Sequence, residues 1–428
     1  MHSWRSPSSA LETGDDVRSS GKTQLGGHSS RNPSKNFPGA GGVRSNARLE
    51  VRVPPGSAAV QTRQEVNRLR TAPPRSGFAR FLRVVRNTMF WIIGVILAIA
   101  LVIFVWLQLT PWPGSMVIRM AFDERAKVVQ SDLVKYVPDG VDVRQDIPYR
   151  SGDADALLDV YTPDGVRGSG AALPTIVWVH GGAWISGSKE LISNYMRVLA
   201  GEGYTAIAVE YTIAPEGQYP LPIEQVADSL GYLDANARAL NVDSSKLILA
   251  GDSAGAQIAA QVANVVTSSE YASSIKVESP IEPEQLAGVV LACGAYDLSL
   301  VNAEGSFGWF LDTVLWSYFG ARDYKTRPEV ASASVVDYLT AKYPPTYITV
   351  GNWDPLYPQS VEFKAKLQGL GVDVQSMIFN PDFRPGLEHE YQFLLNDQGR
   401  FNLQRMDAFI DGVTDTSLPF GQQGPPVR

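Results

Sequence analysis

The pentapeptide Gly251-Asp252-Ser253-Ala254-Gly255 decides the fold. It closes the apolar run Lys246-Leu-Ile-Leu-Ala250, and a helix-like run from Ala256 to Val266 follows it. A serine flanked by glycines at a strand-to-helix turn is typical of a nucleophile elbow, where the glycines relieve crowding and the helix N-terminus favours developing negative charge. The alternative is an ordinary turn in which Asp252 or Ser253 caps the helix. A serine hydroxyl is a weak nucleophile, so the elbow predicts a histidine base and an orienting carboxylate elsewhere in the chain.

A second glycine-rich motif, His180-Gly181-Gly182-Ala183-Trp184, comes directly after the apolar run 175–179. Glycines let backbone N–H groups approach an oxyanion without a Cβ atom in the way. We therefore expect the N–H groups of Gly181, Gly182 and Ala254 to form an oxyanion hole. For His180, a structural role that holds this loop is favoured over proton transfer.

The expected base is His389, one of only four histidines in the chain. It follows the last predicted strand, where a loop returns to the carboxyl edge of the sheet and can present an imidazole to Ser253. Asp354 follows the predicted strand 347–350 and is the expected orienting acid, which gives the order Ser, Asp, His of α/β-hydrolases. Asp297 is the alternative acid, and Asp252 is interpreted as an elbow or helix-cap residue. A surface histidine is the alternative for His389.

From about residue 140, short apolar runs alternate with amphipathic ones, which predicts a mostly parallel sheet covered by helices on both faces. The predicted strands are 141–149, 157–161, 175–179, 206–211, 246–250, 289–293, 347–350 and 374–379, and the predicted helices are 191–201, 223–240, 254–266, 358–370 and 390–410. The first two strands are expected to pair.

Five motifs together, in order and spacing, resemble the hormone-sensitive-lipase-like branch of the α/β-hydrolases over residues 115–412. They are His180-Gly-Gly-Ala-Trp184, Glu210-Tyr-Thr-Ile-Ala-Pro-Glu216, Gly251-Asp-Ser-Ala-Gly255, Asp354-Pro-Leu356 and His389. The resemblance implies hydrolysis of carboxylic esters without a cofactor, a triad of Ser253, Asp354 and His389, and an oxyanion hole of Gly181, Gly182 and Ala254. The sequence departs from the family at Ala183, where a third glycine is common, and at Thr212, where arginine is common, which makes a local ion pair at 212 doubtful.

The resemblance also implies a helical cap over the site, with segments near 298–330 and 113–137. The first segment is rich in bulky apolar residues: Phe307, Trp309, Phe310, Leu311, Trp316, Tyr318 and Phe319. Two interpretations stay open, because these side chains could line an acyl or alcohol pocket or simply pack the cap onto the core.

The N-terminal part has a different composition. Residues 1–86 hold 15 Lys and Arg against 5 Asp and Glu and few aromatics, which predicts a disordered basic tail. The uncharged apolar run 89–107 would reach about 28 Å as a helix, so residues 87–110 are predicted to span a membrane, with Trp91 and Trp106 near its ends. A buried core helix and a signal peptide are the alternatives. The hydrolase domain is expected over 111–414, and 415–428 as a flexible tail.

Arginines dominate the segment before the apolar run, so the positive-inside rule predicts a cytoplasmic N-terminus and an extracytoplasmic catalytic domain. Beyond residue 86 the chain is acidic, which argues against nucleic acid as a partner. The single cysteine, Cys293, permits no intrachain disulfide, and no histidine spacing indicates a metal site, so neither metal nor cofactor is expected.

The sequence therefore predicts a membrane-anchored serine hydrolase that cleaves small-molecule carboxylic esters through an acyl-enzyme intermediate. Anchoring and the aromatic cap favour a lipidic or otherwise hydrophobic ester, and polar acetylated compounds remain open. Acyl transfer and amide or peptide cleavage are alternatives on the same fold, and a non-catalytic binding module is the alternative from another class.

Overall fold

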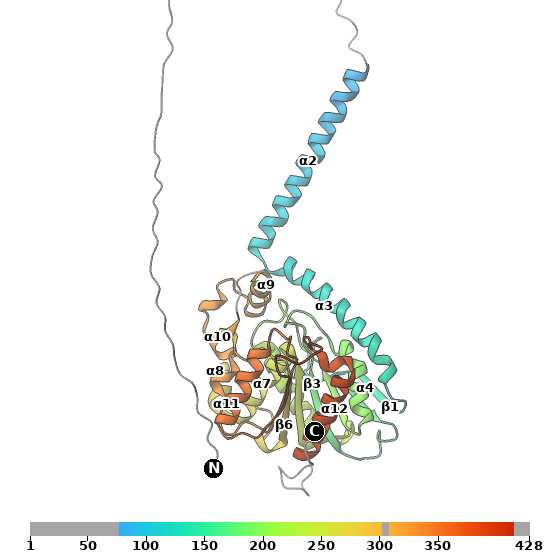
Figure 1. The fold of residues 1–428 in the computed structure, drawn as a ribbon, viewed down its shortest axis with the longest axis vertical. Coiled ribbons are helices and arrows are strands. Elements are labelled where there is room, and N and C mark those ends of the chain that lie inside the picture. Colours follow the sequence, from blue (N-terminus) through green and yellow to red (C-terminus); the bar gives the residue numbers. More distant parts are fainter. Residues whose placement is uncertain (1–76, 302–307, 415–428) are drawn as a thin grey trace, which may run out of the picture. The chain divides into compact units, whose positions relative to one another are not determined.

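The computed structural model describes residues 77–301 and 308–414, and its centre is an eight-stranded sheet (Figure 1). The strand order is β1-β2-β4-β3-β5-β6-β7-β8. The pairs β1–β2 and β2–β4 are antiparallel, and every other pair of neighbours in this order is parallel. The strands are β1 Val141–Pro148, β2 Leu157–Pro163, β3 Leu173–Val179, β4 Thr205–Val209, β5 Val242–Asp252, β6 Leu286–Ala292, β7 Thr346–Val350 and β8 Val374–Ile378. All eight predicted strands are present, and the predicted α/β-hydrolase fold class is confirmed.

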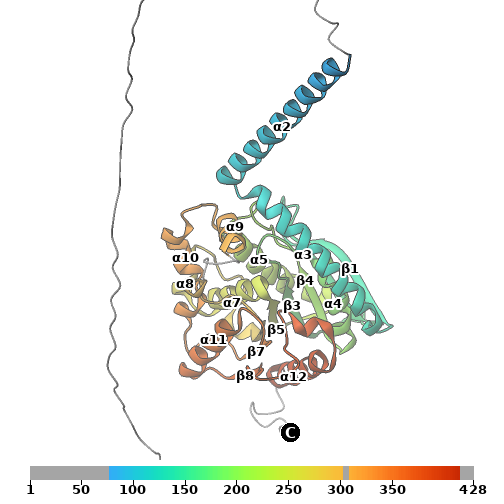
Figure 2. The ribbon, with the colours of Figure 1, turned by 45° about the horizontal axis from the view of Figure 1, so that its top comes forward.

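Helices cover both faces of this sheet (Figure 2). Helices α5, α7 and α11 contribute to the hydrophobic cluster on one face, and α4 and α12 contribute to the cluster on the other. Their bounds are α4 Ser193–Gly201, α5 Leu221–Ala235, α7 Ser253–Thr267, α11 Tyr357–Gly369 and α12 Asp397–Thr414, with α6 Ala237–Leu240 and α8 Ser269–Ile275 as short additions. The parallel strands are apolar on both sides because neither side meets water.

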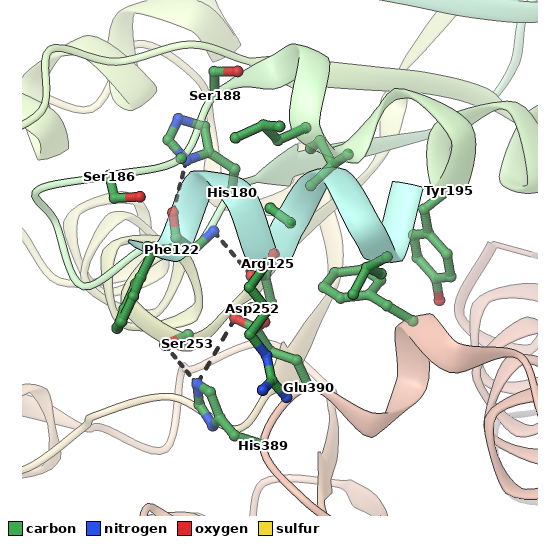
Figure 3. Close-up of a pocket in the computed structure, with 18 of the residues that line it drawn as sticks. Phe122, Arg125, His180, Ser186, Ser188, Tyr195, Asp252, Ser253, His389 and Glu390 are labelled. Atoms are coloured by element: carbon green, nitrogen blue, oxygen red, sulfur yellow. Dashed lines mark hydrogen bonds and ion pairs between the residues drawn. The ribbon is translucent and has the colours of Figure 1, made fainter. Parts of the chain in front are cut away.

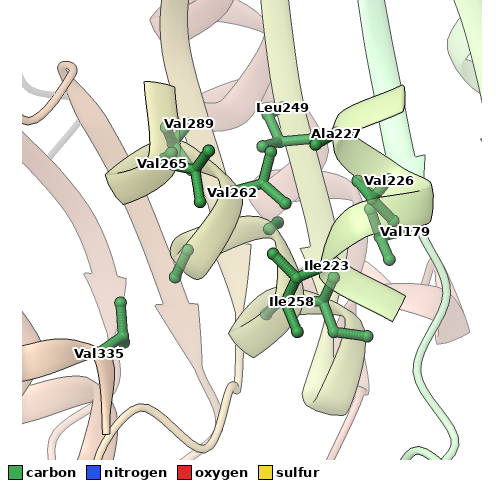
Figure 4. Packing of buried hydrophobic residues seen from close by; sticks show 14 of the residues in the cluster. Val179, Ile223, Val226, Ala227, Leu249, Ile258, Val262, Val265, Val289 and Val335 are labelled. Atoms are coloured by element: carbon green, nitrogen blue, oxygen red, sulfur yellow. The ribbon is translucent and has the colours of Figure 1, made fainter. Parts of the chain in front are cut away.

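The central helix α7 is buried along its whole length. Its small and β-branched residues, among them Ile258, Val262 and Val265, pack between the sheet and helix α5 (Figure 4). Burial of this kind is worth about 0.8 kcal/mol for each methylene removed from water. The core therefore fixes the position of the first turn of α7, where Ser253 lies.

Two predicted helices differ from the observed ones. The run 223–240 divides into α5 and α6 at Asn236, and the run 390–410 does not start as an α-helix. Glu390 and Leu395 adopt left-handed backbone conformations on either side of the 3₁₀ turn Tyr391–Leu394. Helix α12 begins only after Asn396, whose side-chain oxygen accepts the N–H of Gly399 at 3.0 Å, as an N-cap does.

The apolar segment before the hydrolase part is one helix, α2, from Gly77 to Leu109. It is long and apolar enough to cross a bilayer by length and composition, and none of its residues is buried. The helix starts ten residues before the predicted boundary at 87, because no proline or glycine interrupts residues 78–86. The predicted tails lie mostly outside the described residues, at 1–76 and 415–428.

Two segments predicted as cap pack against each other. Helix α3, Trp112–Leu133, meets helix α9, Gly308–Phe319, through the hydroxyls of Ser115 and Ser317 at 2.7 Å. The rings of Phe122 and Phe310 lie 5.7 Å apart at the same contact. A Cβ atom at Gly114 would lie 2.8 Å from Thr313, so glycine permits the close approach of the two helices. We call α3 and α9 the cap helices. Phe307 falls outside the described residues.

Candidate active site

Ser253 lies on a sharp turn between β5 and α7. Its backbone is in the left-handed region, with φ of +51°, whereas the preceding Asp252 is extended. A Cβ atom at Gly255 would lie 2.1 Å from the carbonyl oxygen of Val179, so this position tolerates only glycine. The packing around Ser253 maintains its strained backbone conformation. At this turn the hydroxyl projects beyond the end of the sheet.

The structure brings the three predicted residues of the triad together. His389 Nε2 lies 2.9 Å from Ser253 Oγ, and His389 Nδ1 lies 2.8 Å from Asp354 Oδ2. The other carboxylate oxygen of Asp354 accepts the backbone N–H of Leu356 at 2.7 Å. Figure 3 shows Ser253 and His389 facing each other at the pocket. The imidazole can therefore accept the serine proton on one nitrogen while the carboxylate fixes the proton on the other.

The alternative acid lies elsewhere. The carboxylate of Asp297 accepts the N–H of Ser299 at 2.7 Å, and its backbone exchanges hydrogen bonds with the side chain of Gln359. Asp297 thus begins a 3₁₀ turn after β6. Of the two candidate acids, Asp354 is the one in contact with His389.

The electrostatics of the imidazole follow from its neighbours. Burial lowers the pKa of His389, but the adjacent Cys293 thiol and Asp354 carboxylate raise it more, so the pKa ends well above 6.5. Burial also raises the pKa of the Cys293 thiol to about 11. Since the thiol is then neutral at pH 7, the carboxylate of Asp354 is the charge that stabilises the imidazolium.

The expected oxyanion donors differ in their partners. The N–H of Gly181 donates to Asp252 Oδ2 at 2.9 Å and is therefore occupied. Within residues 77–301 and 308–414, no backbone or side-chain group accepts the N–H of Gly182 or of Ala254. These two N–H groups are free to bind an oxyanion beside Ser253, and Gly181 holds the loop to the elbow. Gly182 has φ of +112°, and a Cβ atom there would lie 2.1 Å from Ser186 O.

Asp252 is the N-cap residue of α7 and part of the elbow, in line with its interpretation, but its side chain makes no capping hydrogen bond. Its carboxylate accepts Trp178 Nε1 at 2.7 Å as well as the N–H of Gly181. Burial and the nearby carboxylate of Glu390 raise the pKa of Asp252 to about 7. Glu390 lies 3.7 Å from His389 Nε2 and has φ of +61°. Sequence reasoning missed Glu390, and its position directly after His389 was the only available signal.

His180 occupies a structural position, as expected. Its ring stacks on Tyr211 with centroids 4.3 Å apart, and its Nε2 lies 3.3 Å from Glu210 Oε1. The Tyr211 hydroxyl donates to the carbonyl of His180 at 3.0 Å. We call residues 180–184 the oxyanion loop. These contacts fix the start of this loop on the segment 210–216.

A second residue missed from the sequence is Arg119 on cap helix α3. Its guanidinium pairs with both carboxylate oxygens of Glu216, at 2.9 and 2.8 Å, and donates to the carbonyls of Ile185 and Ala214. An arginine from another segment thus forms an ion pair with the segment that contains Thr212. Thr212 instead donates to Asp155 Oδ2 at 3.0 Å.

Ser253 opens into a cavity of about 490 Å³. Its lining comes from α3, the oxyanion loop, the segment 186–195 and the loop around His389 (Figure 3). None of the six described aromatic and leucine residues expected in the 298–330 segment lines this cavity. Tyr318, for example, stacks on Trp184 with centroids 4.8 Å apart. For this cavity, packing onto the core is the interpretation that the structure supports.

One group of side chains in the described part of the chain has the atoms of a metal site. Donor atoms of Cys293, Asp354 and His389 lie within 4.8 Å of one another. Asp354 and His389 are already hydrogen-bonded to each other. The same atoms that would bind a metal thus orient the imidazole toward Ser253.

Comparison with known proteins finds relatives that are named esterases. Residues 158–367 match the family model named BD-FAE. An esterase of Gibberella moniliformis is 31% identical over 215 residues, which are 47% of this chain and 63% of that protein. An ethyl acetate hydrolase of Pseudomonas putida is 27% identical over 283 residues, which are 64% of this chain and 81% of that protein. The chain thus spans less than two thirds of the length of the first of these relatives.

Among solved structures, esterase B from Lactobacillus rhamnosis has the same fold. An inhibited form of it aligns with a TM-score of 0.59 and 21% identity, over 70% of this chain and 96% of that chain. The chain is thus similar in sequence to named esterases, and its fold is that of an esterase. The motifs found in the sequence lie at or just after the carboxyl ends of β3, β4, β5 and β7, and on the loop that carries His389.

Proposed function

We propose that the protein is a membrane-anchored serine hydrolase that cleaves carboxylic esters. The observation that carries this proposal is the continuous chain of hydrogen bonds from Ser253 Oγ through His389 to Asp354, at 2.9 and 2.8 Å. At its Ser253 end, this series of hydrogen bonds meets a cavity large enough for a small-molecule ester. The named esterases among its relatives support the same class of substrate.

The geometry implies a two-step reaction. His389 Nε2 takes the proton of Ser253 as Oγ attacks the ester carbonyl, and the N–H groups of Gly182 and Ala254 bind the oxyanion that forms. The imidazolium, stabilised by Asp354, then gives its proton to the departing alkoxide, and the acyl group stays on Ser253. A water molecule, activated by His389 in the same way, releases the carboxylic acid and restores the serine.

The test is hydrolysis by the full-length protein in detergent or membranes. We expect release of p-nitrophenol from p-nitrophenyl esters and labelling by a fluorophosphonate probe, which reports an activated serine. Products are analysed with and without alcohol and amine acceptors, because dominant acyl transfer would replace hydrolysis as the assignment. A folded protein that neither hydrolyses any ester nor reacts with the probe would instead be a binding module.

Membrane anchoring rests on helix α2, whose apolar stretch is followed by the hydrolase part and preceded by Arg80, Arg83 and Arg86. Basic residues on that side favour a cytoplasmic N-terminus, which leaves the catalytic domain outside. Signal-sequence use of the same helix is the competing outcome.

Single cysteines test this orientation, since native Cys293 is buried. In intact cells we expect a membrane-impermeant maleimide to label Ser279→Cys, an exposed position in the hydrolase part, and to label Ser45→Cys only after permeabilisation. The reverse pattern would overturn the orientation. Release of the protein by alkaline carbonate would overturn the anchoring.

A further inference from the structure

The cavity at Ser253 has one apolar wall made by a single face of α3. The residues that line it from this helix at helical spacing are Phe122, Ala126, Val129 and Leu133. Positions i, i+4, i+7 and i+11 fall on one stripe of an α-helix. Val128, one residue away, points to the other side and is 62% exposed. The stripe therefore belongs to the cavity and not to a generally apolar helix.

This wall leads away from the reacting atoms. Arg125, at the start of the stripe, pairs with Glu388 at 3.5 Å, which places this end of the stripe beside His389. From Phe122 to Leu133 the helix rises by about 16 Å. Leu133 is 2% exposed, and Figure 3 shows Tyr195 at the opposite end of the α3 segment from Ser253. The lining of the cavity thus extends from Ser253 to the buried C-terminal end of α3, and we call this part of the cavity the channel.

The facing wall is apolar as well. It consists of Leu191, Ile192 and Tyr195 from the segment before and within α4, and of Phe393 from the turn after His389. Tyr195 and Phe393 pack edge to face with ring centroids 4.9 Å apart. A group that enters between these walls exchanges water for hydrocarbon on both sides.

Charge restricts what can enter. The carboxyl groups of Asp252 and Glu390 border the channel near Ser253, and Asp252 is buried. For an anionic group the repulsion by these carboxyl groups is partly offset by Arg125, which lines the same end, and the larger cost is the hydration that it would lose in the apolar part beyond. A neutral chain meets neither cost.

We propose that the substrate is a neutral ester with a long unbranched hydrocarbon arm, and that this arm lies beneath α3 along Phe122, Ala126, Val129 and Leu133. The inference rests on the proposed ester hydrolysis and adds the class of ester to it. Each methylene buried in the channel raises kcat/KM by about fourfold until the channel is full. An arm that ends in a carboxylate gains nothing from its length.

The test compares two substitutions on adjacent residues of α3. Val129→Trp fills the channel, and Val128→Trp places the same bulk on the exposed face. The substrates are p-nitrophenyl acetate, butyrate, octanoate and dodecanoate for the acyl arm, and ethyl and octyl acetate for the alcohol arm. We expect kcat/KM of the full-length protein to rise with length in one series. Val129→Trp should lower kcat/KM for the longest ester of that series at least tenfold and should change kcat/KM for the acetate by no more than about threefold.

Further measurements keep the outcome unambiguous. Val128→Trp should retain the wild-type length profile. If Val129→Trp folds poorly, Ala126→Leu replaces it and should reduce the dependence on chain length to a smaller extent. A p-nitrophenyl ester whose octanoyl arm ends in a carboxylate should have a kcat/KM no higher than that of p-nitrophenyl acetate. Length profiles that are flat in both series, or unchanged by Val129→Trp, overturn the channel. If the folded wild-type protein hydrolysed no ester of either series, the result would instead refute the proposed ester hydrolysis itself.

Discussion

Alanine at Ser253 or at His389 is expected to lower kcat for ester hydrolysis by about 10⁶-fold each. Ser253→Ala removes the attacking oxygen, and His389→Ala removes the imidazole that contacts Ser253 Oγ and can accept its proton. The remaining rate comes from binding and from the N–H groups of Gly182 and Ala254, which neither substitution removes. Steady-state rates on p-nitrophenyl acetate measure the effect.

The double variant distinguishes a catalytic unit from two independent contributions. Since the serine and the imidazole act in the same step, Ser253→Ala combined with His389→Ala should be no slower than either single variant. Ser273→Ala, an exposed serine in α8, is the matched control and should keep both full activity and probe labelling. Hydrolysis that survives in Ser253→Ala, with a normal thermal melt, would contradict the nucleophile assignment.

The sequence predicts the sheet well because local signals and packing agree there. Runs such as Thr175–Val179 are apolar and β-branched, and they become strands buried on both faces. Turn chemistry also decides the elbow, because the glycines at 251 and 255 are required by atoms that lie within 3 Å of any added Cβ atom. The order of motifs then predicts His389 as the base and Asp354, with Asp297 as the alternative, as the acid, since the carboxyl ends of parallel strands meet at one edge.

The parts that escape the sequence depend on contacts between distant segments. Nothing local at Arg119 indicates that it would pair with Glu216, 97 residues later. Similarly, the stripe on α3 reads as an ordinary amphipathic pattern until the opposing wall at Leu191–Tyr195 is known. The late start of α12 reflects backbone conformations at Glu390 and Leu395 that propensity disfavours and tertiary packing imposes.

Asparagine at Asp354 is expected to lower kcat by about 10⁴-fold and to change the pH profile. In the native site, Leu356 donates its N–H to one carboxylate oxygen and His389 donates from Nδ1 to the other. The amide of asparagine keeps its oxygen on Leu356 and turns its NH₂ toward Nδ1. Nδ1 must then accept, the ring proton moves to Nε2, and the imidazole can no longer take the proton of Ser253.

The direction of the pH shift follows from the raised pKa of His389. The base works only when neutral, so activity of the wild-type protein is low below this pKa and rises as the pH passes through it, above 6.5. Without the Asp354 carboxylate the imidazolium loses its stabilising charge, the pKa falls, and the acid limb of kcat/KM should move to lower pH. Asp297→Asn is the control and should leave both the rate and the limb unchanged. If the acid limb shifted in Asp297→Asn and stayed native in Asp354→Asn, Asp297 would be the acid that orients His389. Of these two acids Asp354 is the one that contacts the imidazole, so we expect the shift in Asp354→Asn alone.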